Sequence, residues 1–120
     1  MSEVRLELDT VEGFFDDARA LARRLDAGDR QPRTASIGFE GMDTLLSVLT
    51  ANRWRLLKAL RRHGPSSIRR LAADLQRDYR GVHADVSTLL QYGLIARRDD
   101  RLIEVPWSKI TAEMAFDSAA

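Results

Sequence analysis

The sequence predicts a mainly helical α+β fold, and three patterns along the chain support this prediction. Hydrophobic residues recur at helical spacing over most of the segment 42–92. Apolar and polar residues alternate at 3–9 and again at 35–40, which is typical of half-buried strands. Short apolar runs after residue 93 flank a polar turn, the pattern of a β-hairpin. We therefore expect a strand–helix–strand extension at 1–41, followed by a helical domain with a hairpin at 42–120.

The composition limits the class of protein. The chain has 120 residues, of which 44% are apolar and 31% charged, so it has room for one compact domain with a small appendage. It contains no cysteine, which excludes disulfides and thiolate metal sites. The sequence shows no apolar run of about 18 residues and no basic segment followed by an apolar one at the N-terminus, so we expect neither a membrane span nor a signal peptide. These features predict a soluble cytoplasmic protein.

The charge is unevenly distributed, although the net charge is only +1. Residues 1–50 carry six Arg and ten acidic residues, which gives a charge of −4. Residues 51–101 carry twelve Lys or Arg and five Asp, which gives +7, and the remaining residues carry −2. A central segment this basic is typical of a phosphate-binding surface. A basic face that is merely solvated is the alternative.

The N-terminal third should form two strands joined by a helix. Apolar residues alternate at 4–8 and 35–39, and between them an amphipathic helix over 11–25 begins after a cap at Thr10. The connection is long enough for right-handed parallel pairing of the strands. Because a two-stranded sheet is marginal in water, we expect this extension to pair with a second copy or a partner protein. Packing on the chain's own C-terminal part is the alternative.

Two helices in tandem are predicted from Met42 onward. Apolar residues at 45–49 mark the first helix, and Thr50 is a good N-cap for the second, whose apolar stripe includes Trp54. Gly64 and the proline after it end the second helix, since proline cannot continue a helix. Basic residues surround this apolar stripe.

The next stretch predicts two further helices joined by a short turn. Ser67 is placed to cap a helix over 68–75, and Asp78 is placed to cap a longer helix that runs to Tyr92 and is followed by a left-handed Gly93. The turn begins at Gln76, where such turns commonly hold glycine. Either this residue adopts a left-handed conformation at some cost, or the turn has a different shape.

The longer helix divides into an apolar stripe and a polar stripe. The inner stripe consists of Val82, Val86, Leu89 and Leu90, and the outer stripe of Arg80, His83, Ala84, Ser87 and Gln91. A helix with small and hydrogen-bonding side chains outward fits the major groove of DNA, which is about 12 Å wide. An ordinary solvent-exposed face is the alternative. The helix spacing, the caps and the basic charge together favour insertion into the groove.

After Gly93 the sequence predicts a hairpin with a charged tip. Apolar residues at 94–95 and 102–105 form its strands, and 98–101 form a tight turn. The arginines of the tip are suited to phosphate or minor-groove contact. The two aspartates of the tip point to the alternative of a salt-bridged turn without a ligand, because like charges near phosphate cost energy.

A last short helix is predicted after Pro106. The spacing of Trp107, Ile110, Thr111 and Met114 places them on one side of this helix, which indicates packing in the core or in a dimer. A regulator of two-fold symmetric operators requires a dimer. We expect the first strand and this last helix to form the seam of a homodimer.

These patterns predict a DNA-binding surface on the basic central segment. Phosphate contacts are expected from the arginines of the helices and of the hairpin, and base contacts from the outer face of the longer helix. The predicted DNA-binding residues are Arg53, Ser67, Arg69, Arg77, Tyr79, Arg80, His83, Ala84, Ser87, Arg97, Arg98 and Arg101.

No sequence feature predicts catalysis, a metal or a cofactor. His63 and His83 lie on different predicted helices, without cysteine or a carboxylate at metal-ligand spacing. His63 should lie at a helix end, near the C-terminal carbonyls. No glycine-rich phosphate loop is present. The serious rival to DNA binding is a module for protein contact alone, which would show a neutral or apolar outer face where this chain has Arg80 and His83.

A resemblance to a known family extends over about 42–114. It rests on the stretches GPSSIRRLA, DYRGVHADV and YGLI and on the short hairpin that follows them. This region resembles the winged-helix, MarR-like family of predicted transcriptional regulators of archaea and bacteria. The resemblance implies a winged helix-turn-helix that binds DNA as a dimer, with a recognition helix at 79–92 in which Arg80 and His83 read bases. It also implies an antitoxin-like regulator encoded beside a small toxin. The acidic N-terminal third is then the expected binding site for the toxin.

Overall fold

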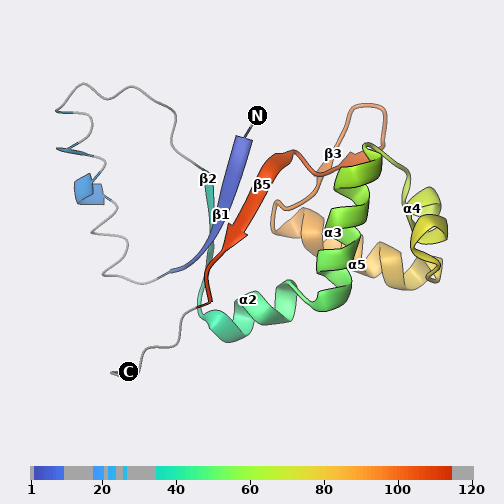
Figure 1. Cartoon of the computed structure of the whole chain (residues 1–120), viewed down its shortest axis with the longest axis horizontal. Coiled ribbons are helices and arrows are strands. Elements are labelled where there is room, and N and C mark those ends of the chain that lie inside the picture. Colours follow the sequence, from blue (N-terminus) through green and yellow to red (C-terminus); the bar gives the residue numbers. More distant parts are fainter. Residues whose placement is uncertain (1, 10–17, 21, 24–25, 27–34, 115–120) are drawn as a thin grey trace.

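The computed structural model in Figure 1 describes residues 2–9, 18–20, 22–23, 26 and 35–114. It has a mixed α/β fold with a small sheet at one end and a group of helices at the other. The elements are β1 (Ser2–Leu8), β2 (Ala35–Phe39), α2 (Met42–Val48), α3 (Ala51–His63), α4 (Ile68–Leu75), α5 (Tyr79–Gln91), β3 (Ala96–Arg97), β4 (Ile103–Glu104) and β5 (Trp107–Ala112). Within the described ranges, no helix combines the length and the apolar character that crossing a membrane requires.

The three longer strands form one parallel sheet in the order β2–β1–β5. Val4 of the central strand lies opposite Ala35 on one side and Ile110 on the other. The predicted parallel pairing of the first two strands is therefore confirmed. The third strand comes from the chain's own C-terminal part, which corresponds to the alternative of local packing.

The prediction of a last helix after Pro106 is wrong, because residues 107–112 form β5. Their apolar residues suit a helix, but Ile110 and Ala112 also alternate as strand residues do. Both lie opposite buried residues of β1. Pairing with β1 satisfies backbone groups of this segment, and its aromatic and β-branched residues favour a strand. A partner more than 100 residues away in the sequence therefore decides the structure here.

The helix predicted over 11–25 falls largely outside the described residues. Residues 18–20, 22–23 and 26 are helical. The predicted cap at Thr10 and the predicted loop at 29–33 lie outside the described part of the chain. The prediction for this segment therefore stays untested beyond those six residues.

The central helices begin and end where the sequence predicts. Thr50 caps α3 by accepting a hydrogen bond from the N–H of Arg53 at 3.3 Å, and Ser67 caps α4 by accepting from the N–H of Arg70 at 3.1 Å. α3 ends at Gly64, whose φ of 86° suits glycine. Each side-chain cap stabilises its helix by about 1 kcal/mol. Local sequence signals thus fix these helix boundaries.

β3 and β4 form the predicted antiparallel hairpin, with Ala96 opposite Glu104. The connection between α3 and α4 adds one more bridge to this hairpin. Ser66 exchanges two backbone hydrogen bonds with Ile103, at N···O distances of 3.0 and 2.9 Å. This bridge attaches the hairpin to the helices, and no local sequence pattern predicts it.

One hydrophobic core joins the sheet to the helices. Leu6 and Phe39 of the sheet belong to the same buried cluster as Leu57 and Leu89 of the helices. Phe39 also stacks on Tyr92, with ring centroids 5.4 Å apart. Full burial of such a side chain contributes about 1.5–3 kcal/mol. The strands and core residues on the two sides of the predicted domain boundary after residue 41 therefore belong to one sheet and one core.

Candidate nucleic-acid interface

α4 and α5 are joined by three residues whose conformation is fixed by hydrogen bonds. Gln76 has φ 54° and ψ 45°, so the left-handed alternative is confirmed. The N–H of Arg77 donates to the carbonyl oxygen of Ala72 at 3.1 Å, and Asp78 accepts from the N–H of Gly81 at 2.9 Å. These bonds satisfy backbone groups at the end of α4 and the start of α5. The turn thereby holds α5 in a defined orientation against α4.

α5 has the two faces that the sequence predicts. Val82, Val86 and Leu89 are buried in the core, and Leu90 is partly buried against it. The opposite stripe is exposed and consists of Arg80, His83, Ala84, Ser87 and Gln91. The exposed stripe offers one cation and several hydrogen-bonding groups. The helix can therefore contact a ligand with this face without disturbing the core.

Three of the predicted DNA-binding residues form a cluster at the start of α5. The Arg69 guanidinium, from α4, lies 5.8 Å from the ring centroid of Tyr79. The Tyr79 ring lies 5.8 Å from that of His83, one turn further along α5. A guanidinium over an aromatic ring is held by cation–π attraction. The cluster links α4 to α5 and places Arg69 beside the exposed face of α5.

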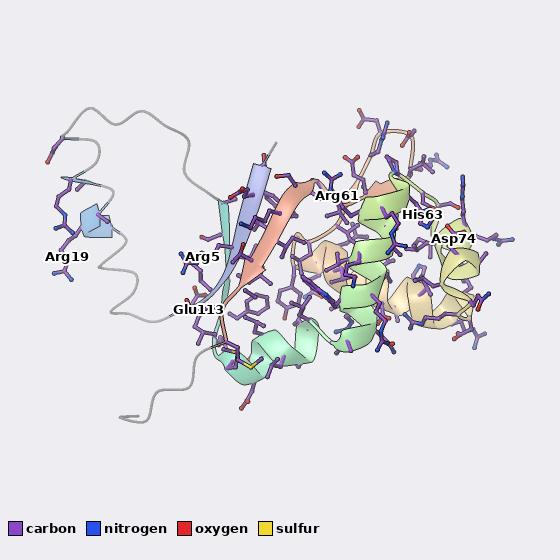
Figure 2. The ribbon with its side chains drawn as sticks, viewed as in Figure 1. Arg5, Arg19, Arg61, His63, Asp74 and Glu113 are labelled. Carbon is purple, nitrogen blue, oxygen red and sulfur yellow. The ribbon has the colours of Figure 1, made fainter. Side chains whose placement is uncertain are left out.

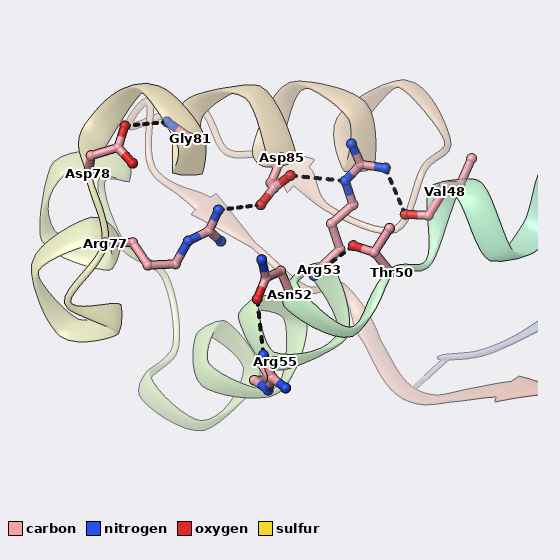
Figure 3. Close-up of polar contacts among 9 residues, drawn as sticks. All are labelled: Val48, Thr50, Asn52, Arg53, Arg55, Arg77, Asp78, Gly81 and Asp85. Carbon is pink, nitrogen blue, oxygen red and sulfur yellow. Dashed lines mark hydrogen bonds and ion pairs between the residues drawn. The ribbon is translucent and has the colours of Figure 1, made fainter.

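The opposite flank of α5 carries an ion-pair network centred on Asp85 (Figure 3). Arg53 Nε lies 3.0 Å from Asp85 Oδ1, and Arg77 Nη2 lies 2.9 Å from Asp85 Oδ2. Arg53 Nη1 also donates to the carbonyl oxygens of Ser47 and Val48, both at 3.0 Å. The three charged side chains are only 14–27% exposed. The network therefore connects the end of α2, the start of α3, the turn and α5.

The network changes the roles of two predicted residues. Arg53 and Arg77 are predicted to contact phosphate, but in the structure both are paired with Asp85 and largely withdrawn from the surface. A phosphate contact would require them to leave a half-buried carboxylate unpaired, which is costly. We therefore assign them to holding α5 in place. The sequence analysis did not single out Asp85, whose only signal is its position as the sole acidic residue within α5.

The tip of the hairpin combines paired and exposed arginines. Arg98 lies 3.4 Å from Asp100 and 3.7 Å from Glu104, and Asp100 also accepts from the N–H of Leu102. Arg98 thus agrees with the alternative of a salt-bridged turn. Arg97 and Arg101 are exposed. The tip projects beyond the C-terminal end of α3 (Figure 1).

The predicted residues therefore fall into three groups, with Ser67 apart from them. Six of them lie on α4 and α5 and are exposed: Arg69, Tyr79, Arg80, His83, Ala84 and Ser87. The three arginines of the hairpin lie at its tip, and Arg53 and Arg77 lie in the Asp85 network. Ser67 is exposed, but its hydroxyl oxygen is engaged as the cap of α4.

The two histidines lie apart in the fold. His63 is exposed at the last residue of α3 (Figure 2), whereas His83 lies on α5. Within the described part of the chain, no group of three or more His, Cys, Asp or Glu side chains is arranged to hold a metal ion.

A family model named HVO_A0114 matches residues 48–112, which is more than half of the chain. The chain belongs to the HVO_A0114 family. The HVO_A0114 segment begins at the last residue of α2 and ends at the last residue of β5. It includes the Asp85 network and the exposed face of α5, and it leaves out β1 and β2. No curated protein and no solved structure matches the chain.

Proposed function

We propose that this protein is a transcriptional regulator that binds duplex DNA through a winged helix-turn-helix. In this proposal α5 is the recognition helix and the β3–β4 hairpin is the wing. The observation that carries the proposal is the exposed face of α5. It presents a cation and hydrogen-bonding groups on a helix whose opposite side is fixed by the core and by the Asp85 network.

The arrangement of the elements supports the winged-helix interpretation. α4 and α5 are separated by a three-residue turn with caps on both helices, as a helix-turn-helix requires. The bridge between Ser66 and Ile103 holds the hairpin against the connection that leads into α4. The hairpin and the helix pair are therefore joined, and together they can engage DNA at two places.

The dimensions and chemistry of α5 suit the major groove. Its 13 residues make a helix about 20 Å long, and the groove is about 12 Å wide. Arg80 is suited to a bidentate contact with guanine, and Ala84 to an apolar contact with a thymine methyl group. His83 and Ser87 can add hydrogen bonds. Modest sequence readout is expected from this small set.

Phosphate contacts are assigned to exposed arginines only. Arg69 lies beside the start of α5, and Arg97 and Arg101 lie at the hairpin tip. The central segment 51–101 has a net charge of +7, which counts Arg53, Arg77 and Asp85. Pairing with Asp85 withdraws only two of its cations, so the surface of this segment stays cationic. Such a surface neutralises backbone phosphate and attracts DNA at a distance.

A module for protein contact alone is the rival proposal. It would be favoured by a neutral or apolar face on α5, whereas the exposed stripe is polar and includes Arg80. Other parts of the proposal stay predictions: a homodimer on a two-fold operator, a cytoplasmic location and a toxin partner bound through the N-terminal third. Co-purification with the product of the neighbouring gene would test the toxin partner.

A salt titration tests whether phosphate neutralisation drives binding. Fluorescence anisotropy of a labelled 30-base-pair duplex should show affinity falling as NaCl rises from 50 to 200 mM. Three or four phosphate contacts per protomer predict a slope of about −3 in log affinity against log salt. An affinity that does not depend on salt would contradict the proposal.

The variant Arg80→Ala tests the recognition face directly. After selection of preferred duplexes from a random library, this variant should lose about 1–3 kcal/mol of preference over random DNA. The matched control is Arg5→Ala, which removes the same charge from the exposed side of the sheet (Figure 2). If Arg80→Ala weakened binding to both duplexes equally, Arg80 would be a phosphate contact and the readout face would lie elsewhere.

A further inference from the structure

A groove runs along the outer edge of β5, between this strand and the helices α2 and α3. One part, of about 620 Å³, lies between β5, α2 and the start of α3. A second part, of about 270 Å³, lies between β5 and the C-terminal half of α3. Trp54, Lys109 and Ile110 line both parts, so the two are continuous. Figure 1 shows β5 running alongside α3 and ending near α2.

The groove lies beside an open sheet edge. β5 is the last strand of the sheet and, within the described residues, pairs only with β1. A parallel strand directs part of its backbone N–H and C=O groups to each side, so the outer side of β5 offers unpaired donors and acceptors. An extended segment can pair with such an edge and place alternate side chains in a neighbouring pocket.

The part of the groove near α2 is apolar and open. Leu46 is 44% exposed, Trp54 is 40% exposed and Met114 is 69% exposed. All three line the larger part of the groove, with Leu49 and Ile110 beside them. A contiguous group of exposed large apolar side chains in a concave surface marks an interaction site.

The part near the C-terminal end of α3 is cationic. Lys58, Arg61 and Arg62 line it, and Lys109 lies where the two parts meet. Among the described residues that line the groove, the one acidic residue is Glu113, which lies 3.5 Å from Arg5. Figure 2 shows Arg61 and Glu113 at opposite ends of β5. The groove therefore has a positive end and an apolar end.

We infer that this groove binds an extended, acidic segment of a partner protein, which adds to β5 as a further strand. Apolar side chains of the segment occupy the part beside Leu46 and Trp54, and its carboxylates lie near Lys58 and Arg62. A second copy of this chain fits less well. Pairing two β5 strands about a two-fold axis would bring two cationic α3 helices together, which costs energy.

Selection of peptides identifies the chemistry that the groove accepts. A phage library of random 12-residue peptides is selected on the immobilised full chain, and the enriched peptides are synthesised. We expect them to combine alternating apolar residues with carboxylates at one end. Both tryptophans of the chain line the groove, so binding should change the intrinsic fluorescence. Selection without acidic enrichment, or binding without a fluorescence change, would overturn the inference.

Charge reversal locates the bound peptide. Lys58→Glu should weaken the selected peptides at least tenfold, which is about 1.4 kcal/mol or more. The control Arg55→Glu makes the same change on the same helix outside the groove lining and should change affinity less than about twofold. If both variants lost the same affinity for the peptides, the effect would be a general one of net charge, which would contradict the inference.

An apolar pair of variants gives a second, independent test. Leu46→Glu should abolish the fluorescence response, whereas Leu8→Glu, at another exposed leucine outside the groove, should keep it. Leu46 is exposed, so the fold should tolerate its replacement; circular dichroism checks this.

Peptide binding should persist in Arg80→Ala, so failure of this inference is distinguishable from failure of DNA binding. Displacement of the peptide by duplex DNA would assign the groove to nucleic acid instead.

Discussion

The two flanks of α5 use arginine for opposite purposes. On one flank, Arg53 and Arg77 pair with Asp85 at 3.0 and 2.9 Å and are largely withdrawn from solvent. On the other flank, Arg80 and His83 are exposed. The inner arginines fix where the helix lies, and we propose that the outer one contacts the ligand. A basic sequence therefore overstates the number of side chains available to bind phosphate.

The difference between the flanks comes from one carboxylate. Asp85 lies between the buried and the exposed stripes of α5, close enough to reach both α3 and the turn. Arg53 gains a charge-assisted hydrogen bond to this partly buried carboxylate, and Arg77 forms an ion pair with it. An arginine on the far side of the helix has no such partner among the side chains of α5. Whether an arginine of this region is paired or exposed therefore depends on its position relative to Asp85.

The largest expected effect follows from removing Asp85. Asp85→Ala leaves two partly buried guanidinium groups without their carboxylate, so the free energy of unfolding should fall by about 3 kcal/mol. Urea denaturation measures this value. The control Asp74→Ala removes an exposed carboxylate from α4 (Figure 2) and should change stability by less than about 0.5 kcal/mol. Equal effects of the two substitutions on the free energy of unfolding would show that the network does not stabilise the fold.

An intermediate effect is expected at the start of α5. Asp78→Ala removes the side chain that accepts from the N–H of Gly81, and stability should fall by about 1 kcal/mol. Asp78→Asn keeps an acceptor oxygen at the same place and should retain most of that stability. Thermal unfolding of the two variants side by side makes the comparison. A full loss in Asp78→Asn would assign the effect to charge at the helix end instead of to the hydrogen bond.

The smallest effect on stability is expected on the outer flank. Arg80→Ala and His83→Ala remove exposed side chains, so the free energy of unfolding should change by less than about 0.5 kcal/mol. Urea denaturation of both variants, with Arg53→Ala as the destabilised reference, measures the contrast. A loss above about 1 kcal/mol in Arg80→Ala would mean that the outer flank also supports the fold.

The sequence predicted α3, α4 and α5 well because the signals for their ends are local. Thr50, Ser67 and Asp78 each cap the helix that follows, and glycine or a left-handed residue ends α3 and α4. It failed for β5, whose apolar spacing suits a helix and a strand equally. The choice depends on β1, more than 100 residues earlier in the chain. No window of neighbouring residues contains that information.

The candidate site was predicted in part for the same reason. The exposed face of α5 follows from the helical period, so Arg80, His83 and their neighbours were placed correctly on the surface. The network was not predicted, because Arg53 and Asp85 are 32 positions apart and meet only when α3 packs beside α5. Charge counts along the chain cannot separate a paired arginine from an exposed one.

The central place of β1 has a consequence for synthesis of the protein. The strand that both neighbours need is made first, and its partner β5 leaves the ribosome about 100 residues later. At typical elongation rates this delay is about 5–20 s. During that interval one edge of β1 stays open to other chains. Nascent molecules are therefore most prone to aggregate before residue 112 emerges, and slowing translation of the hairpin should lower the soluble yield.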